Sequence, residues 1–125
     1  MRDLAIHVTH RPGEIARVAT ALGRKDVNIK SIAGMGMNTQ GIIRIIPDDI
    51  EAARSALQDA NIRFEESELA TALLENKAGE LAEVASKLMN VNVNIHAIYV
   101  IGLDGELVEV AMAVDDIKKA KKALE

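Results

Sequence analysis

Asn76-Lys77-Ala78-Gly79-Glu80-Leu81 stands where an apolar run gives way to an amphipathic segment, and His10-Arg11-Pro12-Gly13-Glu14-Ile15 occupies the equivalent place earlier in the chain. In both stretches a glycine opens the amphipathic segment and a glutamate follows it. Further on, each is followed by Val-Asn-Ile, at residues 27–29 and 93–95. The chain therefore reads as two copies of one small unit, each with a glycine-bearing loop between a strand and a helix.

The two copies align with a nearly constant spacing. Gly13 matches Gly79 at an offset of 66 residues, and the same offset holds through the next strand. After the following hairpin the offset becomes 67, because Asp48-Asp49-Ile50 matches Asp115-Asp116-Ile117. We expect the extra residue of the second copy in the turn at residues 103–106, since loop tips tolerate insertions.

Hydrophobic periodicity predicts strand, helix, strand, strand and helix in each copy. The first strand alternates Leu4, Ile6 and Val8 on its buried face, and the first helix has a buried stripe made of Ile15, Val18, Ala19 and Leu22. Residues 34–41, which begin Gly34-Met35-Gly36, are predicted to be a hairpin turn. Residues 61–66 are predicted to be a fourth strand of the first copy.

This element order predicts an α+β protein made of two tandem ferredoxin-like βαββαβ units, with helices on one face of each antiparallel sheet. We place the first unit at residues 1–68 and the second at residues 69–125. The second unit is expected to lack its last strand.

Composition narrows the class of protein. The 125 residues are 49% hydrophobic and 27% charged, which is typical of a folded chain. A net charge of −4 and two aromatic residues, Phe64 and Tyr99, disfavour nucleic-acid binding. No apolar run is long enough to span a membrane, and Met1-Arg2-Asp3 leads into a strand and not a signal peptide, so we expect a cytoplasmic protein without a membrane partner.

The sequence offers little for catalysis or metal binding. Cysteine is absent, which excludes disulfides, thiolate metal ligands and cysteine nucleophiles. The three histidines, His7, His10 and His96, do not have the spacing of a helical metal-binding pair. We therefore predict no enzyme activity, no metal site and no cofactor, and a small enzyme of this fold is the least favoured reading.

The two glycine loops are the best candidates for a binding site. A glycine at the first turn of a helix lets a ligand approach free amide groups, which attract a carboxylate. An asparagine beside it can accept from an ammonium group or donate to a carboxylate. Asn76 or His10, with Asn94 or Asn28 from the adjoining strand, would suit the polar end of an amino acid. The alternative is structural: turn glycines, with Asn76 as an ordinary helix cap.

The second copy, with Asn76, Gly79 and the Val93-Asn94-Ile95 strand, resembles the ACT domain, a small regulatory module that binds amino acids. The whole chain is similar to stand-alone tandem ACT proteins. The resemblance implies a non-catalytic amino-acid sensor that commonly binds its ligand at an interface between ACT units. It gives these candidate ligand-binding residues: Asn76, Gly79, Leu81 and Asn94 in the second copy, and His10, Gly13, Ile15 and Asn28 in the first.

The first copy departs from the family pattern, because His10 stands where asparagine or aspartate is usual. We therefore expect the second loop to be the better site. The expected partners are a free amino acid, a second copy of the chain in a homodimer, and an enzyme or regulator of amino-acid metabolism. An alternative function is an assembly module that oligomerises through sheet edges without a ligand, because a sheet that lacks its fourth strand has an open edge.

Overall fold

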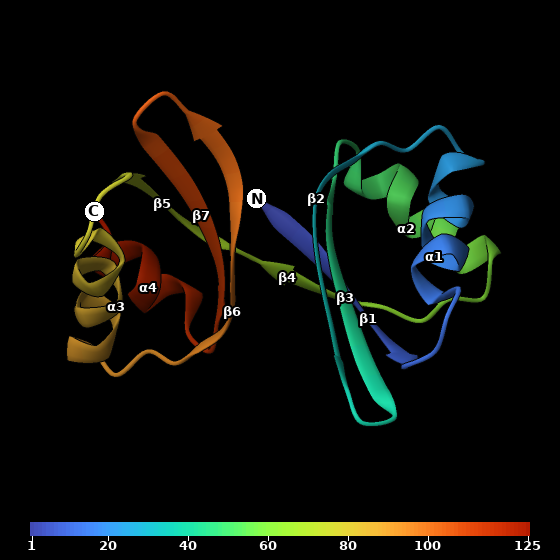
Figure 1. Cartoon of the computed structure of the whole chain (residues 1–125), viewed down its shortest axis with the longest axis horizontal. Helices are drawn as coiled ribbons and strands as arrows, with labels where there is room; N and C mark the ends of the chain where they lie inside the picture. The colour runs from blue at the N-terminus through green and yellow to red at the C-terminus, as the bar shows by residue number, and fades with distance from the viewer. The chain divides into compact units, whose positions relative to one another are not determined.

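Two βαββα segments follow one another along the chain, as the repeat predicts. The computed structural model describes residues 1–125, which fall into two units, Arg2–Ser67 and Glu68–Glu125, the latter together with Met1. In each unit the helices cover one face of the sheet (Figure 1). The predicted fold, two ferredoxin-like units with antiparallel sheets, is confirmed.

The first unit has a four-stranded sheet in the order β2-β3-β1-β4. Its elements are β1 (Arg2–Thr9), α1 (Glu14–Gly23), β2 (Ile29–Met37), β3 (Gln40–Pro47), α2 (Ile50–Asp59) and β4 (Glu65–Glu68). Leu4 pairs with Ile45 and Ile6 with Ile43, so these four side chains face the helices together. They form the core with, among others, Val18, Leu22, Val27, Ala53, Ala56, Leu57 and Ile62.

The second unit has a three-stranded sheet in the order β5-β7-β6, in agreement with the expected missing strand. Its elements are β5 (Ala70–Glu75), α3 (Glu80–Asn90), β6 (Ile95–Asp104), β7 (Leu107–Val114) and α4 (Ile117–Ala123). Its own core contains Ala70, Val84, Leu88, Val93, Val110, Met112 and Ala120. The amide of Leu69 donates to the carbonyl of Met1 at 2.8 Å. No helix of either unit is long and apolar enough to cross a membrane.

The first hairpin differs from the prediction. Gly34, Met35 and Gly36 were predicted as part of a turn, but they belong to β2, and the strands are joined by Asn38 and Thr39 alone. Asn38 has a left-handed φ of 56°, which asparagine tolerates better than most residues. The turn prediction was wrong because it rested on glycine, which is common in turns. Here Gly34 and Gly36 lie within a strand and leave one of its faces without side chains at these positions.

The extra residue of the second copy is also not where the sequence predicted it. The second hairpin has the same two-residue turn, Gly105-Glu106, and Gly105 has a φ of 60° like its counterpart Asn38. The pairing shifts instead between Val100 and Gly102, so that Ile101 forms a bulge in β6. The insertion lies inside a strand because a bulge on an edge strand adds a residue without changing the turn.

Two further predictions need correction. The fourth strand begins at Glu65 and not at Asn61, because the preceding residues end α2: Asn61 has a φ of 57°, and the Ile62 amide donates to the Leu57 carbonyl at 2.9 Å. In α1, Val18 and Leu22 are buried as predicted, but the side chain of Ile15 is 55% exposed. Ile15 lies in the first turn of the helix, beyond the end of the core.

Candidate functional site

The glycine loops have the same backbone conformation in both units. Gly13 has a φ of 96° and Gly79 a φ of 93°, values that an L-residue rarely adopts, which explains why glycine occupies both positions. Each glycine is the N-cap of the following helix, and neither helix receives a side-chain hydrogen bond at its cap. The first-turn amides of α1 and α3 are therefore not capped by a side chain and can interact with an anion.

The residue three positions before each glycine ties its loop to the neighbouring hairpin. The His10 amide donates to the carbonyl of Thr39 at 2.8 Å, and the Asn76 amide donates to the carbonyl of Glu106 at 2.6 Å. Asn76 is thus not the helix cap that the structural reading expected, because Gly79 holds that position. In both units the side chain at this position is exposed beside the end of the hairpin.

A pocket of about 410 Å³ adjoins the first loop. Its floor contains three glycines, Gly34, Gly36 and Gly41, which bring no side chains of their own into the pocket. Gly36 and Gly41 are direct cross-strand partners. A Cβ added to Gly36 would overlap the His10 ring, with Nε2 at 2.7 Å, so the imidazole lies directly on this glycine.

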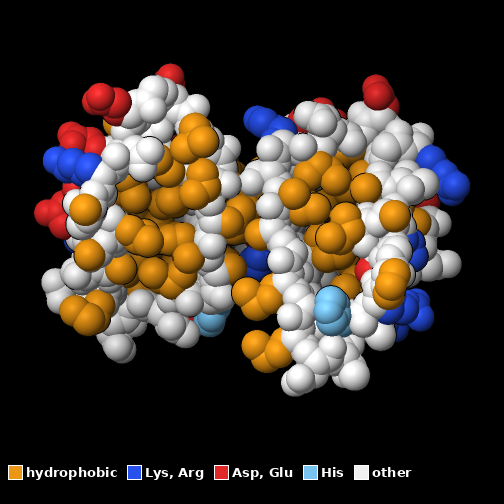
Figure 2. Space-filling model, in the orientation of Figure 1, with side chains coloured by type: hydrophobic (Ala, Val, Ile, Leu, Met, Phe, Trp, Pro, Cys, Tyr) orange, Lys and Arg blue, Asp and Glu red, His pale blue; other side chains and the backbone are white.

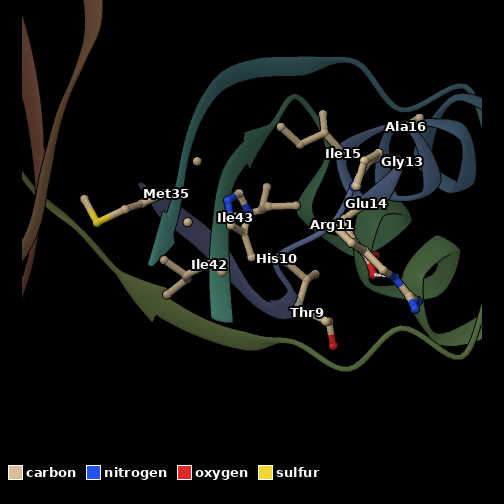
Figure 3. A pocket seen from close by; sticks show the side chains of 15 residues that line it. Thr9, His10, Arg11, Gly13, Glu14, Ile15, Ala16, Met35, Ile42 and Ile43 are labelled. Carbon is tan, nitrogen blue, oxygen red and sulfur yellow. Dashed lines mark hydrogen bonds and ion pairs between the residues drawn. The ribbon is translucent and has the colours of Figure 1, made fainter. Parts of the chain in front are cut away.

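One wall of the pocket is apolar, while Thr9, His10, Arg11 and Glu14 also line it. Val8, Ile15 and Ile43 come from β1, α1 and β3, and Ile15 Cδ1 lies 3.8 Å from the position of a Cβ on Gly34. Figure 3 shows His10, Ile15 and Ile43 around the pocket, whereas Met35 points away from it. Met35 lines the pocket through its backbone, since successive side chains of a strand point to opposite faces.

A charged cluster forms part of the pocket lining, through Arg11 and Glu14. Glu14 is 7% exposed and accepts hydrogen bonds from Arg11 Nε and Arg17 Nε, both at 2.9 Å. The hydrogen bond from Arg17, and then that from Arg11, lowers the pKa of Glu14 against the opposing effect of burial. Glu14 is therefore ionised at neutral pH, and each of its carboxylate oxygens accepts a hydrogen bond from one of the two arginines.

The second loop lacks these features. Val100 and Leu103 stand where the first unit has Gly34 and Gly36, as their strand pairing shows. Lys77, the counterpart of Arg11, pairs with Glu75 at 2.9 Å. Leu81 is 52% exposed, like its counterpart in the first loop.

The two predicted asparagines lie far from the loops within their own units. In the first unit Thr9, next to His10, pairs with Gln40, whereas β2 begins opposite Pro47. Seven residues along β3 correspond to about 23 Å, and the same separation applies between Asn76 and Asn94 along β7. The expectation that loop and asparagine face one place is wrong within a unit, because the helix between them returns the chain to the opposite end of the sheet.

The repeated asparagines have a structural role in the backbone. The Asn28 amide donates to Asp48 Oδ1 at 3.1 Å, and the Asp48 amide donates back to the Asn28 carbonyl at 3.0 Å. Asn94 and Asp115 form the same pair at 3.0 and 3.1 Å. The side chain of Asn94 also adjoins a separate pocket of about 420 Å³, beside the C-terminal half of α3.

Sequence reasoning missed the glycine floor. Gly34, Gly36 and Gly41 were grouped with the turn, although their spacing of two residues around a two-residue turn places them on one face of a hairpin. His10 was treated as a departure from a pattern, and the glycine beneath its ring explains how a residue as large as histidine fits there.

Comparison with known proteins connects this fold to a family. Residues 1–124 match the family described as ACT domain pair, while a search of curated protein sequences found no match. Among solved structures the chain is similar to protein BT0572 from Bacteroides thetaiotaomicron, with a TM-score of 0.86 and 22% identity over 98% of this chain and 85% of that one.

Two further structures are aspartate kinases. The regulatory subunit from Thermus thermophilus, in its ligand-free form, has a TM-score of 0.67 and 17% identity over 98% of this chain and 88% of that one. E. coli aspartokinase III, in complex with lysine and aspartate, has a TM-score of 0.55 and 20% identity over 98% of this chain and 29% of that one. These likenesses support the fold, and the family match covers nearly the whole sequence. The chain therefore belongs to the ACT domain pair family.

Proposed function

We propose that this ACT domain pair is a regulatory protein that binds a free amino acid in the pocket of the first loop. The observation that carries the proposal is the pocket itself: uncapped amides of α1 and the apolar wall meet over the glycine floor. The amides suit an α-carboxylate, and an imidazole nitrogen of His10 can accept a hydrogen bond from an α-ammonium group.

The similar structures support a regulatory role. One is a regulatory subunit of aspartate kinase, and another is an aspartokinase in complex with lysine and aspartate. We propose that the ligand acts by population shift, favouring one state of the protein by its differential affinity for the two states. The partner that reads this state would be an enzyme or regulator of amino-acid metabolism in the cytoplasm.

Isothermal titration of the purified chain with each of the twenty amino acids tests the proposal. At least one of them should give a saturable heat, and the affinity should fall by about tenfold in His10→Ala, the loss of one good hydrogen bond. Asn76→Ala, at the matching position of the second loop, is the control and should keep the wild-type affinity. No heat with any amino acid at several millimolar would refute amino-acid binding.

A second candidate function is assembly into a homodimer through the second unit. β5 and β6 are the edge strands of its sheet, and Ile98, Val100 and Leu103 on β6 are 41%, 53% and 75% exposed. Figure 2 shows hydrophobic side chains gathered on one face of this unit. Exposed apolar groups on an open edge are typical of a surface that pairs with another chain.

The mass in solution tests assembly independently of any ligand. Wild-type chain should sediment as a dimer at micromolar concentration, and Leu103→Lys should shift it to monomer. Met37→Lys, at a similarly exposed methionine of the first unit, is the control. A monomeric wild-type protein would exclude this second function, and Asn76→Ala should leave the mass unchanged in either case.

A further inference from the structure

The two loops carry opposite charge at matched positions. Arg11, Glu14 and Arg17 lie at the first loop, where Glu14 accepts a hydrogen bond from each arginine, and Arg11 and Glu14 line the pocket. The residues at the same places of the second copy are Lys77, Glu80 and Glu83. One net positive charge at the first loop thus becomes one net negative charge at the second, which would repel the carboxylate of an amino acid.

The strand residues beneath the two loops also differ, and this difference again favours a ligand in the first unit. Gly34, Gly36 and Gly41 bring no side chain of their own to the face of the first hairpin toward α1, and His10, Val8 and Ile15 lie over them there. Their counterparts by strand pairing are Val100, Leu103 and Val108, whose side chains occupy that face in the second unit. The bulge at Ile101 preserves this arrangement, because Leu103 still pairs with Val108 as Gly36 pairs with Gly41.

The side-chain end of a ligand in the first pocket would meet Val8, Ile15 and Ile43. No carboxylate is left free to select a cationic side chain, since both oxygens of Glu14 accept hydrogen bonds from the two arginines. The surplus positive charge suits the α-carboxylate that every amino acid has. An apolar wall without a free carboxylate disfavours a lysine or arginine side chain, which would lose water without gaining a partner.

From these contrasts we infer that the ligand is an amino acid with an aliphatic side chain, and that each chain binds one molecule, in the first unit. This inference rests on the proposed function and adds the ligand class and the stoichiometry. The wall of Val8, Ile15 and Ile43 and the glycine floor would distinguish ligands by their side chains, because the contacts to the α-carboxylate and α-ammonium groups are common to all amino acids.

Titration with valine, leucine and isoleucine, and with aspartate, lysine and serine for comparison, tests the class. At least one aliphatic amino acid should bind about tenfold or more tightly than each of the others, as expected for burial of two or more methylene or methyl groups. The fitted stoichiometry should be one ligand per chain. Preferential binding of aspartate or lysine, or two ligands per chain, would overturn the inference while leaving amino-acid binding intact.

A pair of variants tests the place. Gly34→Val puts the second unit's residue on the floor of the first and should weaken leucine binding by about tenfold or more. Gly102→Val on β6 is the matched control, because a Cβ at either glycine meets its nearest atom at an ordinary distance, 3.8 Å for Gly34 and 3.9 Å for Gly102. Equal affinity in both variants, with unchanged circular dichroism and melting temperature, would overturn the placement.

Charge exchange gives an independent readout. Arg17→Glu gives the first loop the net charge of the second loop and should weaken amino-acid binding. Glu83→Arg, in the second loop, should leave the affinity of the first site unchanged. If Glu83→Arg changes the affinity and Arg17→Glu does not, the ligand binds at the second loop. If no amino acid binds to the wild type at all, the proposed function itself fails. If an amino acid does bind, the variants show whether the binding site or the ligand class was assigned incorrectly.

Discussion

At the scale of single residues, the contact between His10 and Gly36 determines the shape of the candidate site. The imidazole rests on a strand position that has no side chain, and the His10 amide is fixed by the Thr39 carbonyl. The ring is exposed on its other side. It can therefore form one end of the pocket without contributing much to the core.

Gly36→Ala should separate binding from stability. The added methyl group overlaps the His10 ring, which can rotate toward solvent, so we expect the free energy of unfolding to change by less than about 1 kcal/mol. The affinity for the amino acid should fall by about tenfold, because the ring leaves the pocket. Urea unfolding and isothermal titration measure the two effects. A large loss of stability with unchanged affinity would show that the contact serves the fold instead.

A second residue, Glu66 in β4, controls the response of the first unit to acid. Arg54 donates to it from Nε and, at 2.9 Å, from Nη2, and Arg2 donates from Nε. These interactions, the Arg54 hydrogen bonds first, lower the pKa of Glu66 from 4.5 to about 2. The ionised carboxylate thus joins β1, α2 and β4 of one unit.

The depressed pKa gives a pH dependence with a definite sign. The stabilisation is fully present above pH 4.5 and is lost as the pH falls toward about 2, because the folded state must then accept a proton that weakens its contacts. Glu66→Gln should destabilise the unit by about 1 kcal/mol at neutral pH, and its free energy of unfolding should fall less than that of the wild type between pH 4.5 and pH 2. Urea midpoints from pH 7 to pH 2 measure it. Parallel pH profiles for wild type and variant would contradict the assignment; Glu65→Gln is the control.

At the scale of elements, the two hairpins show how one fold accommodates an inserted residue. Both have two-residue turns that begin with a left-handed residue, and both have a shift in pairing near the start of the first strand. The second adds a bulge at Ile101. Because the bulge is on an edge strand, the pairing of β7 with β5 stays regular.

Single-residue deletions test this assignment. Deletion of Ile101 should give β6 the regular pairing of β2 and change the free energy of unfolding by less than about 1 kcal/mol. Deletion of Gly105 removes the left-handed position of the turn and should cost about 2 kcal/mol or more. Thermal and urea unfolding compare the two proteins. A greater loss from the Ile101 deletion would mean that the bulge, and not the turn, determines the hairpin.

The element order was predictable because burial on one face of a strand or helix leaves a periodic pattern in the sequence. The repeat also predicted that a glycine opens the first helix of each copy, and a φ above 90° restricts that position to glycine in both. The location of the insertion was not predictable, because an offset of one residue is the same for a bulge and for a longer turn. Strand pairing distinguishes them.

The candidate site was predictable in part. The first loop brings together His10, Gly13 and Ile15, three of the predicted residues. Asn28 lies at the opposite end of the sheet, where its backbone pairs with Asp48. The aspartates are repeated with the asparagines, and the same pair of hydrogen bonds links each asparagine backbone to its aspartate in both units.

At the scale of the whole molecule, each unit has its own hydrophobic core. Leu4, Ile6 and Leu57 are fully buried in the first, and Leu88 and Met112 in the second. A ligand that binds one unit stabilises that unit by a free energy that rises with the logarithm of ligand concentration over the dissociation constant, while the other unit responds only through coupling between them. The distribution of stabilisation along the chain is therefore a direct measure of that coupling.

Hydrogen exchange of the full chain with and without ligand measures this distribution. At a ligand concentration of 100 times the dissociation constant, core amides of β1 and β3 should exchange about 100-fold more slowly, which corresponds to about 2.7 kcal/mol. Core amides of β7 should change by less than about twofold if the units open independently. Gly34→Val with the same ligand concentration is the control: since its affinity should be about tenfold weaker, its β1 and β3 amides should be slowed by only about tenfold or less. Equal protection of both cores by one bound ligand would show that the units unfold as one cooperative body, which is the coupling that a regulatory ACT pair needs to transmit a signal between them.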